Sequence, residues 1–232
     1  MTHFVLIHGG WGGGWQWRAV AQLLRKAGHD STAPTLTGLG ERAHAAPPDI
    51  TLLTHIEDVV QHLWFEDLHD VVLVGWSYGA VVADGAADRV PERLGRVVSL
   101  DGLVPEEGQP IEWEPTVEQL AAGWLPPPTA DDLSDTLSDP ALRAFVAERE
   151  RPQPLAQADV YPDTGGQRWQ VPHTYLLCIE PPEGEDVDDE DRELIDTIRH
   201  DARWDLRELA LNHLGLLYAP DIVAAALIDL AE

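Results

Sequence analysis

Short apolar runs alternate with amphipathic segments along most of this chain. Strands that alternate with helices predict a mostly parallel sheet with helices on its faces, an α/β fold. Residues 71–74 are apolar at every position, which is typical of a central parallel strand buried on both faces. We expect about six strands, at residues 4–7, just before 33, and at 71–74, 97–100, 175–179 and 204–209. The expected helices cover residues 17–27, 54–65, 78–87, 190–200 and 221–231.

The pattern changes between the expected strands at 97–100 and 175–179. From residue 105 onward the chain contains prolines, acidic residues, isolated tryptophans and short helical pieces such as 140–150. A disordered loop would not carry so many large apolar side chains, among them Trp113, Trp124 and Phe145. We therefore expect one core made of residues 1–104 and 170–232, with a small helical lid inserted at 105–169. The length of 232 residues suits this single-domain plan.

The segment Gly75-Trp76-Ser77-Tyr78-Gly79 matches the G-x-S-x-G pattern. It stands between a buried strand and a helix, where the chain must turn sharply. Such a turn strains the serine backbone and raises its hydroxyl above the carboxyl edge of the sheet. The start of the following helix supplies free N–H groups for a developing negative charge. Ser77 is thus predicted to be a nucleophile.

An oxyanion formed by attack of Ser77 needs two hydrogen-bond donors. The backbone N–H of Tyr78, directly after the serine, is the first. The second is expected from the loop after the first strand, with Gly10 as first choice and Gly9 as second. His8, just before them, is expected to support this loop by hydrogen bonds rather than to titrate in catalysis.

A serine hydroxyl needs a base, and in chain order that base follows the last strand. His213 lies in Leu211-Asn212-His213-Leu214-Gly215, just before the final helix. His200 is the nearest rival among ten histidines, but it falls on a predicted helix. His213 is therefore the expected base.

The carboxylate that orients this histidine has two candidates. Glu180 follows the expected strand at 175–179, although Pro181 and Pro182 stiffen its surroundings. Asp101 follows the strand next to that of Ser77, so it reaches the same carboxyl edge of the sheet. Asp101 is preferred and Glu180 stays the alternative.

The chain has nine tryptophans. Four of them are expected near the site, where they would form an apolar, aromatic substrate pocket: Trp11, Trp76, Trp113 and Trp124. Three others, Trp15, Trp17 and Trp64, are assigned to the core.

The formal net charge of −26 and the absence of a basic stripe argue against a nucleic-acid partner. No apolar stretch is long enough to span a bilayer, so no membrane partner is expected. The dense acidic run at 183–193 lacks the spacing of a calcium loop, and no metal site is expected. The single cysteine, Cys178, and a start without a basic signal region favour a cytoplasmic protein. A small-molecule substrate is expected, and a homodimer is left open.

Several stretches resemble one branch of the α/β-hydrolases. Residues 4–17, with His8-Gly9-Gly10-Trp11, look like the opening of the group that contains plant methylesterases, hydroxynitrile lyases and many bacterial esterases. Residues 34–42 and 100–105 are similar to the bacterial esterases. The resemblance covers nearly the whole chain and is weakest between 106 and 169. It implies the α/β-hydrolase fold, a Ser-His-acid triad, and neither metal nor organic cofactor.

Two departures from that group bear on function. The plant lyases carry a threonine and a lysine where this chain has Gly9 and Leu214, so lyase activity is not expected. The usual position of the acid falls at Pro181, whereas some α/β-hydrolases take their acid from the position of Asp101. We expect a carboxylesterase or lactonase acting on a hydrophobic or aromatic ester. The alternatives are a non-hydrolytic lyase, cyclase or isomerase, and a ligand-binding protein on the same scaffold.

Overall fold

A computed structural model describes residues 1–47, 49–105, 107–108, 116–155, 161–162, 164–180 and 189–231 of the chain. Its centre is a six-stranded sheet in the order β2-β1-β3-β4-β7-β8, and every pair of neighbouring strands is parallel. The strands are β1 (His3–Ile7), β2 (Asp30–Thr32), β3 (Val71–Trp76), β4 (Leu94–Leu100), β7 (His173–Cys178) and β8 (Trp204–Leu209). The expected α/β fold and its strand count are confirmed.

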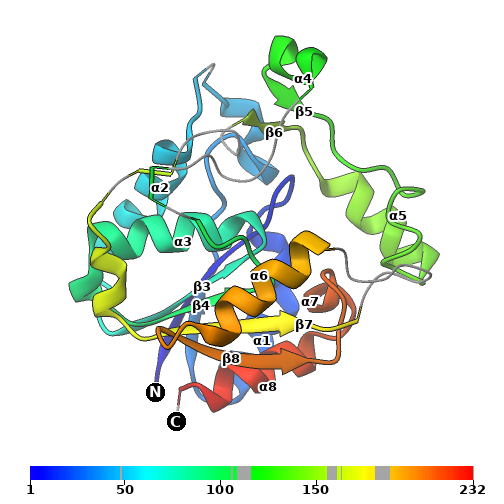
Figure 1. Ribbon diagram of the computed structural model, residues 1–232. Coiled ribbons are helices and arrows are strands. Elements are labelled where there is room, and N and C mark those ends of the chain that lie inside the picture. Colours follow the sequence, from blue (N-terminus) through cyan, green and yellow to red (C-terminus); the bar gives the residue numbers. More distant parts are fainter. Residues whose placement is uncertain are drawn as a thin grey trace.

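Helices cover both faces of the sheet (Figure 1). The α-helices outside the segment between β4 and β7 are α1 (Arg18–Lys26), α2 (Leu52–Phe65), α3 (Tyr78–Arg89), α6 (Asp189–His200), α7 (Gly215–Tyr218) and α8 (Pro220–Asp229). Short 3-10 turns are η1 (Gly14–Trp17), η2 (Gly40–Ala45), η3 (Pro91–Arg93) and η5 (Gln167–Gln170). Helices α2 and α3 pack on one face, while α1 and α8 pack on the other.

All six residues of β3 are buried, because their side chains alternate between two cores. Val71 and Leu73 join the cluster under α2 and α3. Val72, Val74 and Trp76 join the cluster under α1 and α8. Strand β3 thus ends at the carboxyl edge of the sheet, where Ser77 follows it, and is packed between the two cores.

The segment between β4 and β7 contains α4 (Val117–Ala122), β5 (Trp124–Leu125), α5 (Pro140–Arg149) and β6 (Gln153–Pro154). Strands β5 and β6 form a separate antiparallel pair. Helix α5 lies on the side toward which the arrowheads of β7 and β8 point (Figure 1). Helix α5 therefore lies toward the carboxyl edge of the sheet, and Gln153 of β6 binds the backbone of Trp11 in the loop that follows β1.

Local sequence sets the ends of these two helices. Helix α5 begins with Pro140, and the carboxylate of Asp139 accepts the N–H of Ala141 at 2.8 Å. Helix α4 begins with a reciprocal cap between Thr116 and Gln119 and ends at Gly123, whose φ is +74°.

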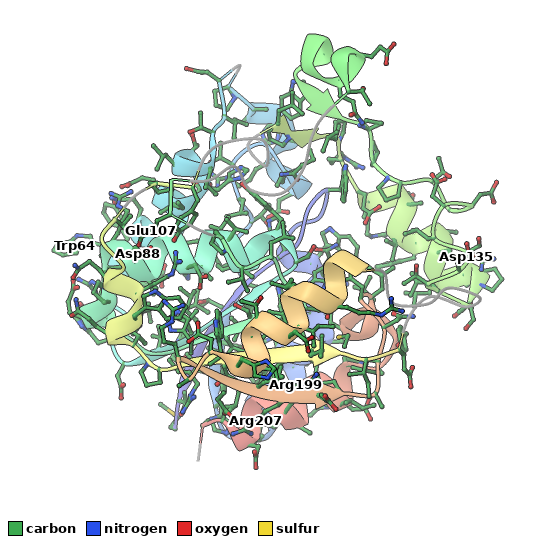
Figure 2. The ribbon with its side chains drawn as sticks, in the orientation of Figure 1. Trp64, Asp88, Glu107, Asp135, Arg199 and Arg207 are labelled. Atoms are coloured by element: carbon green, nitrogen blue, oxygen red, sulfur yellow. The ribbon has the colours of Figure 1, made fainter. Side chains whose placement is uncertain are left out.

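A buried ion pair joins the far end of this segment to α3. Asp88 on α3 accepts the hydroxyl of Tyr161 at 2.7 Å and the backbone N–H of Arg168 at 2.7 Å. The Arg168 guanidinium lies 3.2 Å from the same carboxylate and donates to the carbonyl of Pro105. Figure 2 shows Asp88 on this side of the molecule, away from α5. The segment between β4 and β7 is thus bound to α3 of the core just before β7 begins.

One of the three tryptophans assigned to the core is not in it. Trp17 is fully buried and Trp15 is half-buried, but Trp64 is 62% exposed and lies at the edge of the molecule (Figure 2). Its neighbour Leu63 takes the core-facing position of α2. Trp64 therefore points outward, where the guanidinium of Arg93 lies 4.7 Å from its ring.

Candidate active site

Ser77 occupies the turn between β3 and α3 in a strained conformation. Its φ is +55° and its ψ is −126°, a region that side chains other than glycine rarely adopt. Its N–H donates to the carbonyl of Leu100 on the neighbouring strand at 3.1 Å. Its carbonyl accepts the N–H of Ala80 at 3.0 Å, which starts α3. The serine is therefore fixed by both β4 and α3 and is half-buried.

Three glycines make room for this turn. A Cβ atom on Gly75 would lie 2.3 Å from the carbonyl oxygen of Gly79. One on Gly79 would lie 2.5 Å from the carbonyl oxygen of His8. One on Gly102 would lie 2.2 Å from the Cβ of Ala80. The two glycines of the G-x-S-x-G pattern are thus required sterically, and Gly102, which lies outside that pattern, is a third such position.

Asp101 and His213 form a direct pair across the carboxyl edge. Asp101 Oδ2 lies 2.8 Å from His213 Nδ1, and Asp101 Oδ1 accepts the backbone N–H of Cys178 at 3.0 Å. A carboxylate only accepts, so Nδ1 of His213 carries its proton and Nε2 of a neutral ring is free to accept another. In the described part of the chain no hydrogen bond joins Nε2 to the Ser77 hydroxyl. Such bonds are often long in free enzymes and tighten when substrate binds.

The alternative residues do not make this pairing. Glu180 is exposed, and its backbone N–H donates to the carbonyl of Leu211. His200 lies exposed at the end of α6, where its ring bonds the carbonyl of Asp196. Of the two carboxylates considered, Asp101 is therefore the one in contact with His213.

Trp76 supports the loop that carries His213. It is only 3% exposed, its indole N–H donates to the carbonyl of His213 at 2.9 Å, and the two rings are 5.5 Å apart. Strand β3, which leads into Ser77, and the loop that carries His213 are thus linked directly. A contact between Trp76 and a substrate stays a prediction.

His8 supports the first-strand loop, as expected. Its Nε2 accepts the N–H of Leu36 at 3.0 Å, so its Nδ1 carries the proton and donates to the carbonyl of Gly9 at 2.8 Å. Burial lowers the pKa of His8 to about 4, which keeps the ring neutral. The carbonyl of Gly9 and the N–H of Gly10 belong to one planar, trans peptide and point in opposite directions. His8 therefore fixes the direction of the Gly10 N–H.

The same loop passes close to the nucleophile. A Cβ atom on Gly9 would lie 3.0 Å from the Trp76 ring and 3.3 Å from the Cβ of Ser77. Only glycine lets the backbone come this near without displacing either neighbour. The loop thus brings peptide groups to the side of Ser77.

Tyr78 turns its side chain away from this edge. Its hydroxyl lies 2.7 Å from His55 Nδ1, and His55 Nε2 lies 2.9 Å from the carbonyl of Thr37. A carbonyl only accepts, so His55 donates through Nε2 and, in its neutral form, accepts from the Tyr78 hydroxyl. The ring is thereby held in the core, and the backbone N–H of Tyr78 stays at the first turn of α3.

The remaining predicted pocket residues are placed as follows. Trp11 follows Gly10 and has a φ of +56°. Trp124 is half-buried in β5. Trp113 lies outside the described residues. Their contacts with a substrate stay predictions.

No three histidine, cysteine, aspartate or glutamate side chains gather into a metal-binding group within the part of the chain that the structure describes. Over the same residues, no helix has both the length and the apolar character needed to cross a bilayer.

Comparison with known families decides where this fold and motif belong. A model of the alpha/beta hydrolase family matches residues 4–226. The chain belongs to the alpha/beta hydrolase family. The strand-to-helix serine and the six-stranded parallel sheet are both features of an α/β-hydrolase.

Two curated relatives and one solved structure are similar to this α/β-hydrolase. A carbendazim hydrolyzing esterase of Nocardioides sp. (strain SG-4G) is 50% identical over 111 residues, covering 48% of this chain and 46% of that protein. A putative chloroplastic methylesterase of Arabidopsis thaliana is 30% identical over 173 residues, covering 68% and 38%. The chain thus spans less than half the length of these curated relatives. An extracellular α/β-hydrolase from a Paenibacillus species has a TM-score of 0.80 at 23% identity, covering 99% and 98%.

Two supports of this α/β-hydrolase site had no sequence signal. The indole of Trp76 reaches a carbonyl 137 positions away, and Gln153 reaches the backbone of Trp11 from 142 positions away. Contacts between residues so far apart in the chain depend on how the helices and strands pack together. The hydrophobic periodicity of the sequence carries no information about that packing. Gly102 did have a signal, because it stands in an Asp-Gly pair directly after a strand.

Proposed function

We propose that this chain is a serine hydrolase that cleaves esters of hydrophobic or aromatic compounds by acyl transfer to water. The observation that carries the proposal is the contact between Asp101 and His213 at the sheet edge where Ser77 is held at a φ of +55°. A strained serine and a carboxylate-oriented histidine at the same edge of the sheet are the parts needed for nucleophilic catalysis.

In this proposal the hydroxyl of Ser77 attacks the ester carbonyl while Nε2 of His213 removes its proton. Asp101 keeps Nδ1 of His213 protonated and stabilises the imidazolium that forms. The backbone N–H of Tyr78 and that of Gly10, or of Gly9, hold the negative oxygen. His213 then protonates the departing alcohol. A water deprotonated by His213 releases the acid and restores Ser77.

The proposed substrate class rests on two observations. Aromatic side chains lie on the segments around the site, with Trp11 in the loop after β1 that carries Gly9 and Gly10, and Trp124 in β5. The relative that is 50% identical over 111 residues is named an esterase, and a second relative is named a methylesterase. An ester or lactone with a bulky apolar group fits both.

We extend the proposal to the surroundings of the site. Residues 105–169 act as a lid over it, supported by the position of α5 toward the carboxyl edge (Figure 1) and by the bond of Gln153 in β6 to the backbone of Trp11. A cytoplasmic location is supported by the single cysteine, Cys178.

The experiment that tests the function is a panel of p-nitrophenyl and aryl esters of varied acyl length, assayed with the wild type and with Ser77→Ala. We expect turnover by the wild type and none above background by the variant. Hydrolysis in ¹⁸O-labelled water should place the label in the acid product. A lyase or isomerase would incorporate no solvent oxygen, and a binding protein would turn over no ester, so either result would contradict the proposal.

A further inference from the structure

The loop that carries Gly9 and Gly10 is held from the opposite side by the segment inserted between β4 and β7. The backbone N–H of Trp11 donates to Gln153 Oε1 at 2.9 Å. The carbonyl of Trp11 accepts the backbone N–H of Arg151 at 2.8 Å. Both main-chain groups of the residue directly after Gly10 are thus bound by β6 and the residues before it.

These two contacts hold Trp11 in an unfavourable conformation. Its φ of +56° lies in the left-handed region, which a bulky side chain rarely adopts. Gln153 also carries a cost, because it is fully buried and its Nε2 has no hydrogen-bond partner among the described residues. The hydrogen bond between Trp11 and Gln153 therefore joins a strained backbone to a buried side chain whose amide nitrogen is unpaired within the described part of the chain. Local costs of this kind concentrate at functional sites, where the surrounding structure enforces them.

Gln153 and Arg151 are themselves held by neighbouring elements. Its backbone pairs with Leu125 in the β5–β6 ladder. The guanidinium of Arg151 donates to the carbonyls of Glu148 and Glu150 at the end of α5. The two groups that bind the backbone of Trp11, Gln153 Oε1 and the Arg151 N–H, thus belong to residues attached to the end of α5 and to the β5–β6 pair.

Gly10 lies between two fixed points. On one side the ring of His8 holds the carbonyl of Gly9, and on the other side Gln153 and Arg151 hold Trp11. Glycine has few conformational restraints of its own, so these flanking contacts decide where its N–H points. We propose that Gln153 is a positioning residue of this hydrolase: by binding the N–H of Trp11 it aligns the Gly10 N–H with the negative oxygen of the transition state. This inference rests on the proposed ester hydrolysis.

The test compares Gln153→Met, which keeps the length of the side chain but loses the acceptor, with Gln153→Glu, which retains one. Gln170→Met, an exposed glutamine of η5, is the matched control. We expect Gln153→Met to lower kcat about tenfold to a hundredfold with KM little changed, because a displaced donor acts in the transition state alone. Gln153→Glu should recover most of the loss, and Gln170→Met should match the wild type.

A second readout separates positioning from general damage to the fold. A trifluoromethyl ketone forms a tetrahedral adduct with the serine whose oxygen mimics the transition state, so its affinity should fall in Gln153→Met by the same factor as kcat/KM. All assays are run well below the melting temperature of each variant. Wild-type kcat and wild-type ketone affinity in folded Gln153→Met would overturn the inference while leaving the hydrolase intact. If the wild type itself neither hydrolyses esters nor binds the ketone, the proposed function fails instead.

Discussion

Asp101 Oδ2 lies 2.8 Å from Nδ1 of His213, although the two residues are 112 positions apart in the chain. The carboxylate stands at the end of β4, next to the strand that delivers Ser77, and not after β7. Its second oxygen is bound by the N–H of Cys178 at the end of β7. Asp101 therefore bridges both strand ends and has a φ of +44° that fits it to this corner.

The first prediction follows from that bridge. Asp101→Asn removes the charge and can present an N–H to His213, which favours the wrong tautomer. We expect kcat for a p-nitrophenyl ester to fall by roughly 10³- to 10⁴-fold. The matched variant Glu180→Gln should stay within about twofold of the wild type, because an exposed side chain with no contact to His213 contributes little. A collapse in Glu180→Gln with activity retained in Asp101→Asn would reverse the assignment.

The packing of Gly102 on the serine turn gives a second prediction. In Gly102→Ala the new Cβ would lie 2.2 Å from the Cβ of Ala80 and 3.0 Å from the carbonyl oxygen of Ser77. We expect the free energy of unfolding to drop by about 1–3 kcal/mol, with kcat lowered because the serine must shift.

A double-mutant cycle with Ala80→Gly checks this contact. Ala80→Gly alone should cost about 1 kcal/mol as a glycine in a helix. Combined with Gly102→Ala it should cost less than the sum of the two single changes, because one of the clashing atoms is gone. Strictly additive effects, measured by urea unfolding, would show that the two positions do not press on each other.

The buried ring of His8 gives a pH-dependent prediction. Its pKa is lowered from 6.5 to about 4 in the folded chain, so between these values the unfolded chain binds the extra proton. Stability from this group is fully present above pH 6.5 and is lost as the pH falls toward 4, by about 3 kcal/mol in total.

The measurement is the free energy of unfolding at several pH values for the wild type and for His8→Gln. At pH 6.5 the free energy of unfolding of the variant should be lower than that of the wild type, but it should fall less between pH 6.5 and 4. Glu150, whose pKa burial raises to about 7, contributes with the opposite sign and equally in both proteins. Parallel curves for the two proteins would contradict a neutral, buried His8.

Several parts of this architecture could be predicted from sequence because they depend on local pattern. Residues 71–74 are apolar at every position and predict a central strand just before the serine turn, and the observed β3 extends this strand to Trp76. Asp101 could be ranked first because it stands at the end of an adjacent parallel strand, where carboxyl ends meet. Its actual bond to His213 requires the loop after β8 to reach back across β7 to the end of β4.

Other parts depend on packing between distant segments. Most tryptophans are core residues, which is the expectation for Trp64, yet the face of α2 on which it lies is turned outward. Gln153 belongs to a segment of weak periodicity, and nothing in its neighbourhood signals that its amide reaches Trp11. The reacting groups of the site could be predicted from the sequence, whereas the residues that hold them in place, such as Gln153, could be identified only from the structure.

In the proposed mechanism Ser77 is the nucleophile and His213 activates it. The most direct measurement is intact-protein and peptide mass spectrometry after incubation with a fluorophosphonate ester. The wild type should gain one phosphonyl group, located on the peptide that contains Ser77, and Ser77→Ala should gain none. His213→Ala should react far more slowly, by roughly 10³-fold or more, because the hydroxyl has lost its base. Labelling of Ser77→Ala at the wild-type rate, or labelling of the wild type at another residue, would contradict the account.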